Sequence, residues 1–148
     1  MITLEKILFL REVALFEQIP SAELARIAEV TEEVVVPAGQ LIFSEGDYGD
    51  ALFVIADGRV RITLGERTLA QLEKANYFGE MSLLDGEPRS ASARAEIDTL
   101  LLRIEQKSFH NILSRHFGAA LAVIRTLSRR LRSQLQSGAN EPKREVAR

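Results

Sequence analysis

Residues 78–93 read FGEMSLLDGEPRSASA and carry the polar groups that distinguish this sequence. Glu80 supplies a carboxylate that accepts hydrogen bonds from sugar hydroxyls, and Arg89 supplies a planar guanidinium that fits a phosphate. The apolar helical turn between them starts with unpaired N–H groups, which suit an anion. Ser90 and Ala91 are small enough for a ligand to approach the backbone. A site for a phosphate and a ribose hydroxyl indicates a nucleotide ligand. An Arg and a Glu at this spacing also occur as a surface ion pair, which contributes about 0–1 kcal/mol to stability.

The chain around this stretch divides into a helical, a strand-rich and a second helical segment. We expect N-terminal helices in residues 1–30, strands in 31–105, two C-terminal helices in 106–137 and a disordered polar tail in 138–148. Short apolar runs separated by glycine turns predict six strands, at residues 34–36, 41–43, 51–55, 60–64, 69–72 and 100–104. Short strands at this spacing are typical of a sandwich or barrel, including jelly rolls.

The N-terminal segment has the spacing of an amphipathic helix. Its expected core-facing residues are Leu4, Ile7, Leu8 and Arg11. Ser21 follows the break at Pro20, and we expect it to cap a second short helix.

The last helix carries apolar residues in steps of three and four. This seam resembles heptad a and d positions and contains Leu121, Ile124, Ser128, Leu131 and Leu135. It fits either a homodimer through this helix or packing against the chain's own strands.

Composition excludes several classes of function. The 148 residues carry a net charge of −2, so no overall basic field indicates nucleic acid. The sequence contains no cysteine, which excludes disulfides, thiolate metal sites and cysteine nucleophiles. Its two histidines, His110 and His116, both fall in the second helical segment, so we expect no metal site and no enzyme. The apolar run at 7–10 is too short for a signal peptide or membrane span, and a cytoplasmic location is expected.

Residues 78–93 closely resemble the phosphate-binding cassette of cyclic-nucleotide-binding domains. These domains occur in catabolite activator proteins, in regulatory subunits of cyclic-AMP-dependent protein kinase and in cyclic-nucleotide-gated channels. The resemblance extends upstream through residues 38–60 and downstream to Leu135, covering most of the chain. It implies a mainly β fold with flanking helices, a jelly-roll β-roll (double-stranded β-helix) with N-terminal helices and two C-terminal helices.

The resemblance also assigns roles to individual residues. Glu80 matches the glutamate that binds the ribose 2′-hydroxyl, and Arg89 matches the arginine that pairs with the cyclic phosphate. Leu83 matches an apolar residue that couples the cassette to the later helices, although it also fits as ordinary core. The other expected ligand-binding residues are Gly79, Met81, Ser82, Ser90 and Ala91. Candidates for a base cap on the last helix are Arg129, Arg132 and Ser133.

The function implied is a cyclic-nucleotide sensor that needs no cofactor and converts binding into movement of its C-terminal helices. Cyclic AMP is favoured, and cyclic GMP stays open because the Ser90 hydroxyl would suit either a phosphate or a guanine amino group. No helix-turn-helix follows Leu135 here, so a stand-alone domain without DNA binding is expected, acting on an unknown effector protein. The alternatives are a ligand-independent interaction module with an inactive pocket, or a regulatory fragment of a larger transporter or transcription regulator.

Overall fold

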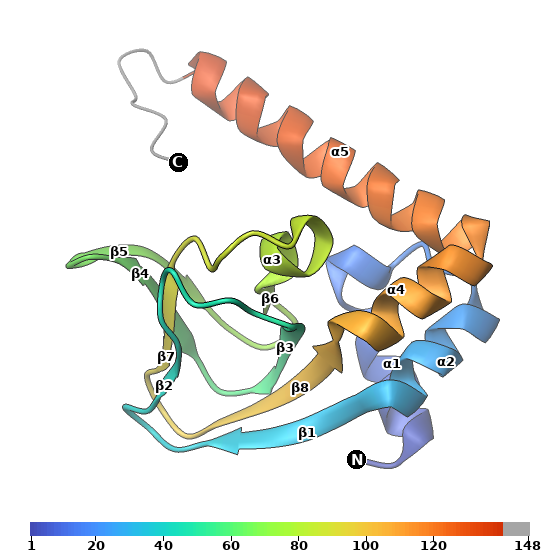
Figure 1. Ribbon diagram of the computed structural model, residues 1–148, viewed down its shortest axis with the longest axis horizontal. Coiled ribbons are helices and arrows are strands. Elements are labelled where there is room, and N and C mark those ends of the chain that lie inside the picture. The colour runs from blue at the N-terminus through green and yellow to red at the C-terminus, as the bar shows by residue number, and fades with distance from the viewer. Residues whose placement is uncertain (141–148) are drawn as a thin grey trace.

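The structure is a computed structural model that describes residues 1–140, with side chains described through residue 137. Figure 1 shows a β-roll with helices gathered at one end and a long final helix crossing above it. In chain order the elements are α1 (Thr3–Arg11), η1 (Ala14–Phe16), α2 (Ser21–Val30), β1 (Thr31–Val36), β2 (Leu41–Phe43), β3 (Ala51–Asp57), β4 (Val60–Leu64), β5 (Arg67–Leu72), β6 (Tyr77–Phe78), α3 (Glu80–Asp85), β7 (Ser92–Ala95), β8 (Thr99–Glu105), α4 (Gln106–Arg115) and α5 (Phe117–Asn140). The predicted mainly β jelly roll with flanking helices is confirmed.

Two antiparallel sheets of four strands form the roll. Their strand orders are β1-β8-β3-β6 and β2-β7-β4-β5. The central strand β3 is a continuous apolar run because both of its faces are covered. Phe53 and Ile55 pack in the core that also contains residues of the second sheet, whereas Leu52 and Val54 pack in the core that contains the helices. This strand therefore separates two apolar cores and fixes the roll relative to the helices.

The helix α1 buries a different face from the one predicted. Leu4 and Leu8 are 60% and 63% exposed, and the buried residues are Phe9 and Leu10. The prediction was wrong because four consecutive apolar residues at 7–10 place apolar side chains around most of the helix, so spacing alone does not select the face.

The second helix starts without the cap that we expected. Ser21 is its first residue and the N-cap position is Pro20, with no side-chain capping bond. The Ser21 hydroxyl instead accepts a hydrogen bond from Arg11 at 3.4 Å. The helix start is thus bound to α1 through a side chain.

The disordered tail was predicted to begin at residue 138, which is before the end of the last helix. Helix α5 continues to Asn140, so residues 138–140 are helical. The rest of the predicted tail, residues 141–148, lies outside the described residues.

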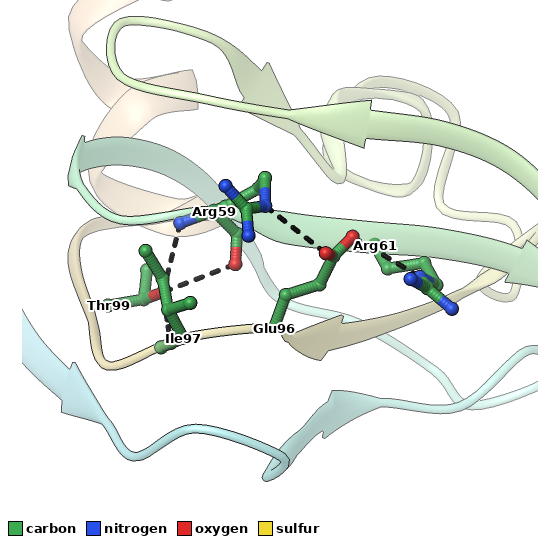
Figure 2. A network of polar contacts seen from close by, with 5 residues as sticks. All are labelled: Arg59, Arg61, Glu96, Ile97 and Thr99. Carbon is green, nitrogen blue, oxygen red and sulfur yellow. Dashed lines mark hydrogen bonds and ion pairs between the residues drawn. The ribbon is translucent and has the colours of Figure 1, made fainter.

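A polar network holds the turn between β3 and β4 against the turn between β7 and β8. Figure 2 shows the Glu96 carboxylate between Arg59 at 3.1 Å and Arg61 at 3.2 Å. Hydrogen bonds donated by Arg61, and to a smaller extent by Arg59, lower the pKa of Glu96 below its ordinary value. The Thr99 hydroxyl forms hydrogen bonds with the Arg59 backbone. A Cβ at Gly58 would lie 2.4 Å from the oxygen of this hydroxyl. These contacts therefore join the two turns at this end of the roll.

Candidate functional site

A cavity of about 260 Å³ opens between the second sheet, the segment after β6 and helix α5. Strands β2, β4, β5 and β6 provide a largely apolar wall, the segment 79–91 provides the polar wall, and α5 provides one arginine. The lining residues are Phe43, Ile62, Leu69, Ala70, Leu72, Tyr77, Phe78, Gly79, Glu80, Met81, Ser82, Arg89, Ser90, Ala91 and Arg130. An apolar pocket with a few convergent polar groups is typical of a small-molecule site.

Arg89 is buried in the wall of this cavity with only 6% of its surface exposed. Its Nη1 donates to the Gly79 carbonyl at 3.1 Å and its Nη2 to the Ala51 carbonyl at 2.9 Å. The guanidinium lies 4.1 Å from the centre of the Phe43 ring. Its Nε has no hydrogen-bond partner among the described residues. Burial lowers the pKa of Arg89 below its ordinary value, against the smaller opposing effects of Asp50 and Asp47.

Within residues 1–140, no carboxylate lies within ion-pair distance of Arg89. A buried cation without a paired anion is costly, and Nε is a donor that still lacks an acceptor. The Arg89 guanidinium in the cavity wall therefore carries a positive charge that no ion pair balances within the described residues.

Two glycines make room for the Arg89 guanidinium. A Cβ on Gly49 would lie 2.0 Å from Nε, and a Cβ on Gly79 would lie 2.7 Å from Nη1. The Arg89 backbone is also fixed, because its N–H donates to the Asp47 carbonyl at 2.7 Å and its carbonyl accepts from Gly46 at 2.8 Å. The space at the two glycines and the fixed backbone together hold the Arg89 side chain in one place.

Glu80 begins α3 and faces α5. Its Oε2 lies 3.3 Å from Nη1 of Arg130, and the Glu80 side chain is 16% exposed. Arg130 also donates to the Tyr77 hydroxyl and lies 4.9 Å from the centre of the Tyr77 ring. Burial raises the pKa of Tyr77, while the charge of Arg130 opposes this effect. The carboxylate expected to meet a ribose is therefore held by the last helix.

All seven expected ligand-binding residues line the same cavity: Gly79, Glu80, Met81, Ser82, Arg89, Ser90 and Ala91. The Ser90 hydroxyl contacts the Met81 sulfur at 3.8 Å. Leu83 is fully buried in the core that contains the helices, and its carbonyl lies 3.2 Å from Gln106 Nε2 and 2.7 Å from His110 Nε2. The segment 79–91 is thus connected directly to α4.

Comparison with known proteins gives the family. The family model described as the cyclic nucleotide-binding domain matches residues 33–116, which include β2 to β8, most of β1 and the segment 79–91. The chain belongs to the cyclic nucleotide-binding domain family. The domain contains Glu80 and Arg89 inside the matched range.

Relatives of this domain occur in regulatory proteins. It is 34% identical over 107 residues to a cAMP-dependent protein kinase regulatory subunit of Emericella nidulans, covering 71% of this chain and 26% of that one. It is 46% identical over 101 residues to the cyclic AMP receptor protein of Thermus thermophilus, covering 65% of this chain and 47% of that one. The crystal structure of the Thermus thermophilus catabolite activator protein has a TM-score of 0.73 and 38% identity, covering 84% of this chain and 61% of that one. The chain therefore spans about a quarter to a half of these curated relatives.

The expected base-cap residues lie elsewhere. Arg129, Arg132 and Ser133 do not line the cavity, and Arg129 pairs with Glu17 at 3.6 Å. The α5 residue that does line it is Arg130. Consecutive helix residues differ by about 100° in direction, so choosing the correct arginine requires the packing of α5.

Sequence reasoning also missed Gly49, Tyr77 and the apolar wall contributed by β4 and β5. Gly49 lies forty residues from Arg89, and no local pattern indicates that it borders the guanidinium. Tyr77 directly precedes residues 78–93, so an extension of that motif by one residue would have included it.

Two features of other classes of function are absent from the described residues. Across residues 1–140, no helix has the length and hydropathy needed to cross a membrane. In the same residues, no group of three or more His, Cys, Asp or Glu side chains is arranged to hold a metal ion.

Proposed function

We propose that this domain binds a cyclic nucleotide in the cavity beside Arg89, prefers cyclic AMP to cyclic GMP and does no chemistry on the ligand. The observation that carries the proposal is the buried Arg89, whose Nε has no acceptor within the described chain. A cyclic phosphate in the cavity would supply a negative charge and hydrogen-bond acceptors to this guanidinium. The preference for cyclic AMP is supported by relatives named for it, a kinase regulatory subunit and a receptor protein.

The other cavity residues complete the site in this proposal. Glu80, beside Gly79, accepts a hydrogen bond from the ribose 2′-hydroxyl. The segment around Ser90 and Ala91 donates hydrogen bonds to the phosphate through backbone N–H groups or the serine hydroxyl. Met81 and Ser82 close the adjoining wall. The base lies against the apolar strands and near Arg130, which replaces Arg129, Arg132 and Ser133 as the proposed contact from α5.

The output that we propose is a shift in the position of the C-terminal helices. A ligand that binds one arrangement of these helices more tightly than another raises the population of that arrangement. Two connections would transmit the change: Leu83 to Gln106 and His110 at α4, and Glu80 to Arg130 on α5. An effector protein that responds to these helices is part of the proposal.

We also propose that α5 pairs with a second copy of itself. Ile124, Leu131 and Leu135 are 59%, 59% and 66% exposed, whereas Ala122 and Val123 on another face pack against the body of the domain. The seam is therefore not covered by the chain's own strands, and heptad spacing suits a helix pair.

The binding proposal is tested by titration calorimetry with cyclic AMP, cyclic GMP and 5′-AMP. We expect a dissociation constant for cyclic AMP near the micromolar range, about −8 kcal/mol, and no detectable binding by Arg89→Ala. Arg94→Ala is the matched control, because Arg94 is an exposed arginine that does not line the cavity. Thermal unfolding of each variant checks that it is folded. If wild type binds neither cyclic nucleotide, the proposal fails and a ligand-independent interaction module is favoured.

A further inference from the structure

A second cavity, of about 280 Å³, lies between α3 and α5. Met81 and Leu84 on α3 and Leu131 on α5 line it, and they are 57%, 38% and 59% exposed. The apolar seam of α5 therefore continues onto α3. Asp85, the last residue of α3, also lines the cavity and is exposed. Among residues 1–137 no ion pair involves its carboxylate.

Helix α5 carries positive charge and no negative charge. Between Phe117 and Asn140 there is no Asp or Glu, and the charged residues are Arg125, Arg129, Arg130 and Arg132. The e and g positions of a heptad flank the apolar seam and form the ion pairs between two paired helices. Two copies of α5 have no carboxylate for these positions. Carboxylates that balance the arginines across such a pair would have to come from another element of the domain.

The heptad register of the seam shows which arginine approaches the cavity. With Leu121 at position a and Leu131 at position d, Leu127 is at g and Arg132 is at e. In a parallel pair, each g residue faces the e residue of the following heptad in the other helix, so Leu127 faces the partner's Arg132. Leu127 lines the cavity that contains Asp85. The Arg132 side chain is exposed and forms no ion pair among residues 1–137.

We propose that a second copy of this chain completes the cavity, with the partner's Arg132 forming an ion pair with Asp85 and its aliphatic stem covering Leu84. This inference rests on the α5 pairing of the proposed function and adds α3 to the interface. It selects the parallel arrangement, because an antiparallel pair would bring the e positions together and place Arg125 near the partner's Arg132. Twofold symmetry forms the contact with Asp85 twice in each dimer.

Two charge-reversed variants of the full chain distinguish a contact between copies from a contact within one copy. In the homodimer of Asp85→Arg two arginines meet at each cavity, and in the homodimer of Arg132→Asp two aspartates meet there. The heterodimer of the two variants contains two attractive pairs, one with the original polarity and one reversed. A contact within one copy would stay repulsive in every combination, so mixing would bring no gain.

The heterodimer fraction of an equimolar mixture is measured by native mass spectrometry, with sedimentation equilibrium for each variant alone. Two partly exposed ion pairs correspond to roughly a twofold to 30-fold gain in dimer affinity. Because each homodimer also suffers repulsion, we expect the heterodimer to be at least about tenfold tighter than the mean of the homodimers. Thermal unfolding checks that each variant is folded.

The matched control is a mixture of Glu87→Arg and Arg125→Asp, which has the same changes in net charge. Glu87 is exposed but does not line the cavity. Arg125 occupies the e position one heptad earlier and would face Ala120, which is not at the cavity either. We expect this mixture to show no comparable excess of heterodimer.

Two results would overturn the inference. If the first mixture shows no excess, or both mixtures show the same excess, the contact between Asp85 and the partner's Arg132 is refuted while the pairing of α5 stands. If wild type is a monomer in sedimentation equilibrium, the pairing of α5 fails and this inference fails with it. Calorimetry with cyclic AMP on the same wild-type sample reports the binding proposal separately, since that proposal does not depend on the dimer.

Discussion

Gly49 offers a direct test of how the Arg89 guanidinium is held. In Gly49→Ala the new Cβ would lie 2.0 Å from Nε and 2.1 Å from Cζ, whereas ordinary contact begins at 3.4 Å. The φ angle of Gly49 is not in the left-handed region, so alanine itself fits the backbone. The strain therefore falls on Arg89, which must retreat by about 1.4 Å, the difference between 3.4 and 2.0 Å.

The expected cost in affinity follows from the bonds that this retreat removes. Nη1 and Nη2 are held at 3.1 Å and 2.9 Å from Gly79 and Ala51, and a shift of this size breaks at least one of these contacts. A guanidinium that is out of place loses at least one charged bond to a phosphate, about 1.5–3 kcal/mol. We therefore expect the dissociation constant for cyclic AMP to rise roughly tenfold to 150-fold.

Titration calorimetry measures this change, with circular dichroism to establish that the variant is folded. Gly118→Ala is the matched control, because its Cβ would meet only Pro20 Cγ at 3.8 Å and its φ is also ordinary. We expect it to bind like wild type. Wild-type affinity in Gly49→Ala would refute this prediction, because it would show that the position of the Arg89 guanidinium does not govern binding.

Three further outcomes are expected. Arg61 and Arg59 lower the pKa of Glu96 in the folded domain. The stability that this interaction contributes is therefore complete above the pKa of the unfolded chain, about 4.3, and is lost as the pH falls through the lower pKa of the folded domain. Thermal melts from neutral to acid pH should therefore depend less on pH in Glu96→Gln, and equal dependence would contradict this. Leu131→Gln should weaken a dimer by roughly 100-fold in sedimentation equilibrium, whereas a monomeric wild type would refute the pairing of α5. Leu83→Ala should lower the free energy of unfolding in urea by about 3 kcal/mol, since Leu83 is 0% exposed; a change below about 1 kcal/mol would contradict its place in the core.

The strands that sequence predicts well are those whose pattern is local. β3 is an unbroken apolar run that ends at Asp57-Gly58, and β8 contains the run Leu100 to Leu102 followed by Arg103 and Ile104. β7 was missed, because Ser92–Ala95 consists mainly of small residues with weak strand preference. β6 was missed because it has only two residues, Tyr77 and Phe78. Both exist because a long neighbouring strand supplies their hydrogen bonds, which is a tertiary effect.

The site divides in the same way. Glu80 and Arg89 belong to one continuous motif, so their shared cavity follows from nearby sequence and the turn that joins them. Gly49 reaches the Arg89 guanidinium and Arg130 reaches the cavity from distant segments, and only tertiary packing brings them there. Heptad spacing in α5 identified a seam, but it could not show which face meets the domain. The buried Ala122 and Val123 on another face decide that question.

The burial of Arg89 has a consequence for the whole domain. A residue kept for stability alone would be paired, since an unpaired buried charge lowers the stability of the fold. Two backbone carbonyls and the Phe43 ring compensate only part of this cost, and Nε stays without an acceptor in the described chain. An anion that supplies the missing charge therefore stabilises the folded domain in proportion to its binding, by about 2.7 kcal/mol at a concentration 100 times its dissociation constant. Arg89 is bonded to Gly79, the next residue Glu80 is bonded to Arg130, and this is the route by which the proposed function connects the ligand to α5. In the proposed function, this incompletely compensated charge, which costs the domain stability, is what would allow a small ligand to bias the position of the last helix.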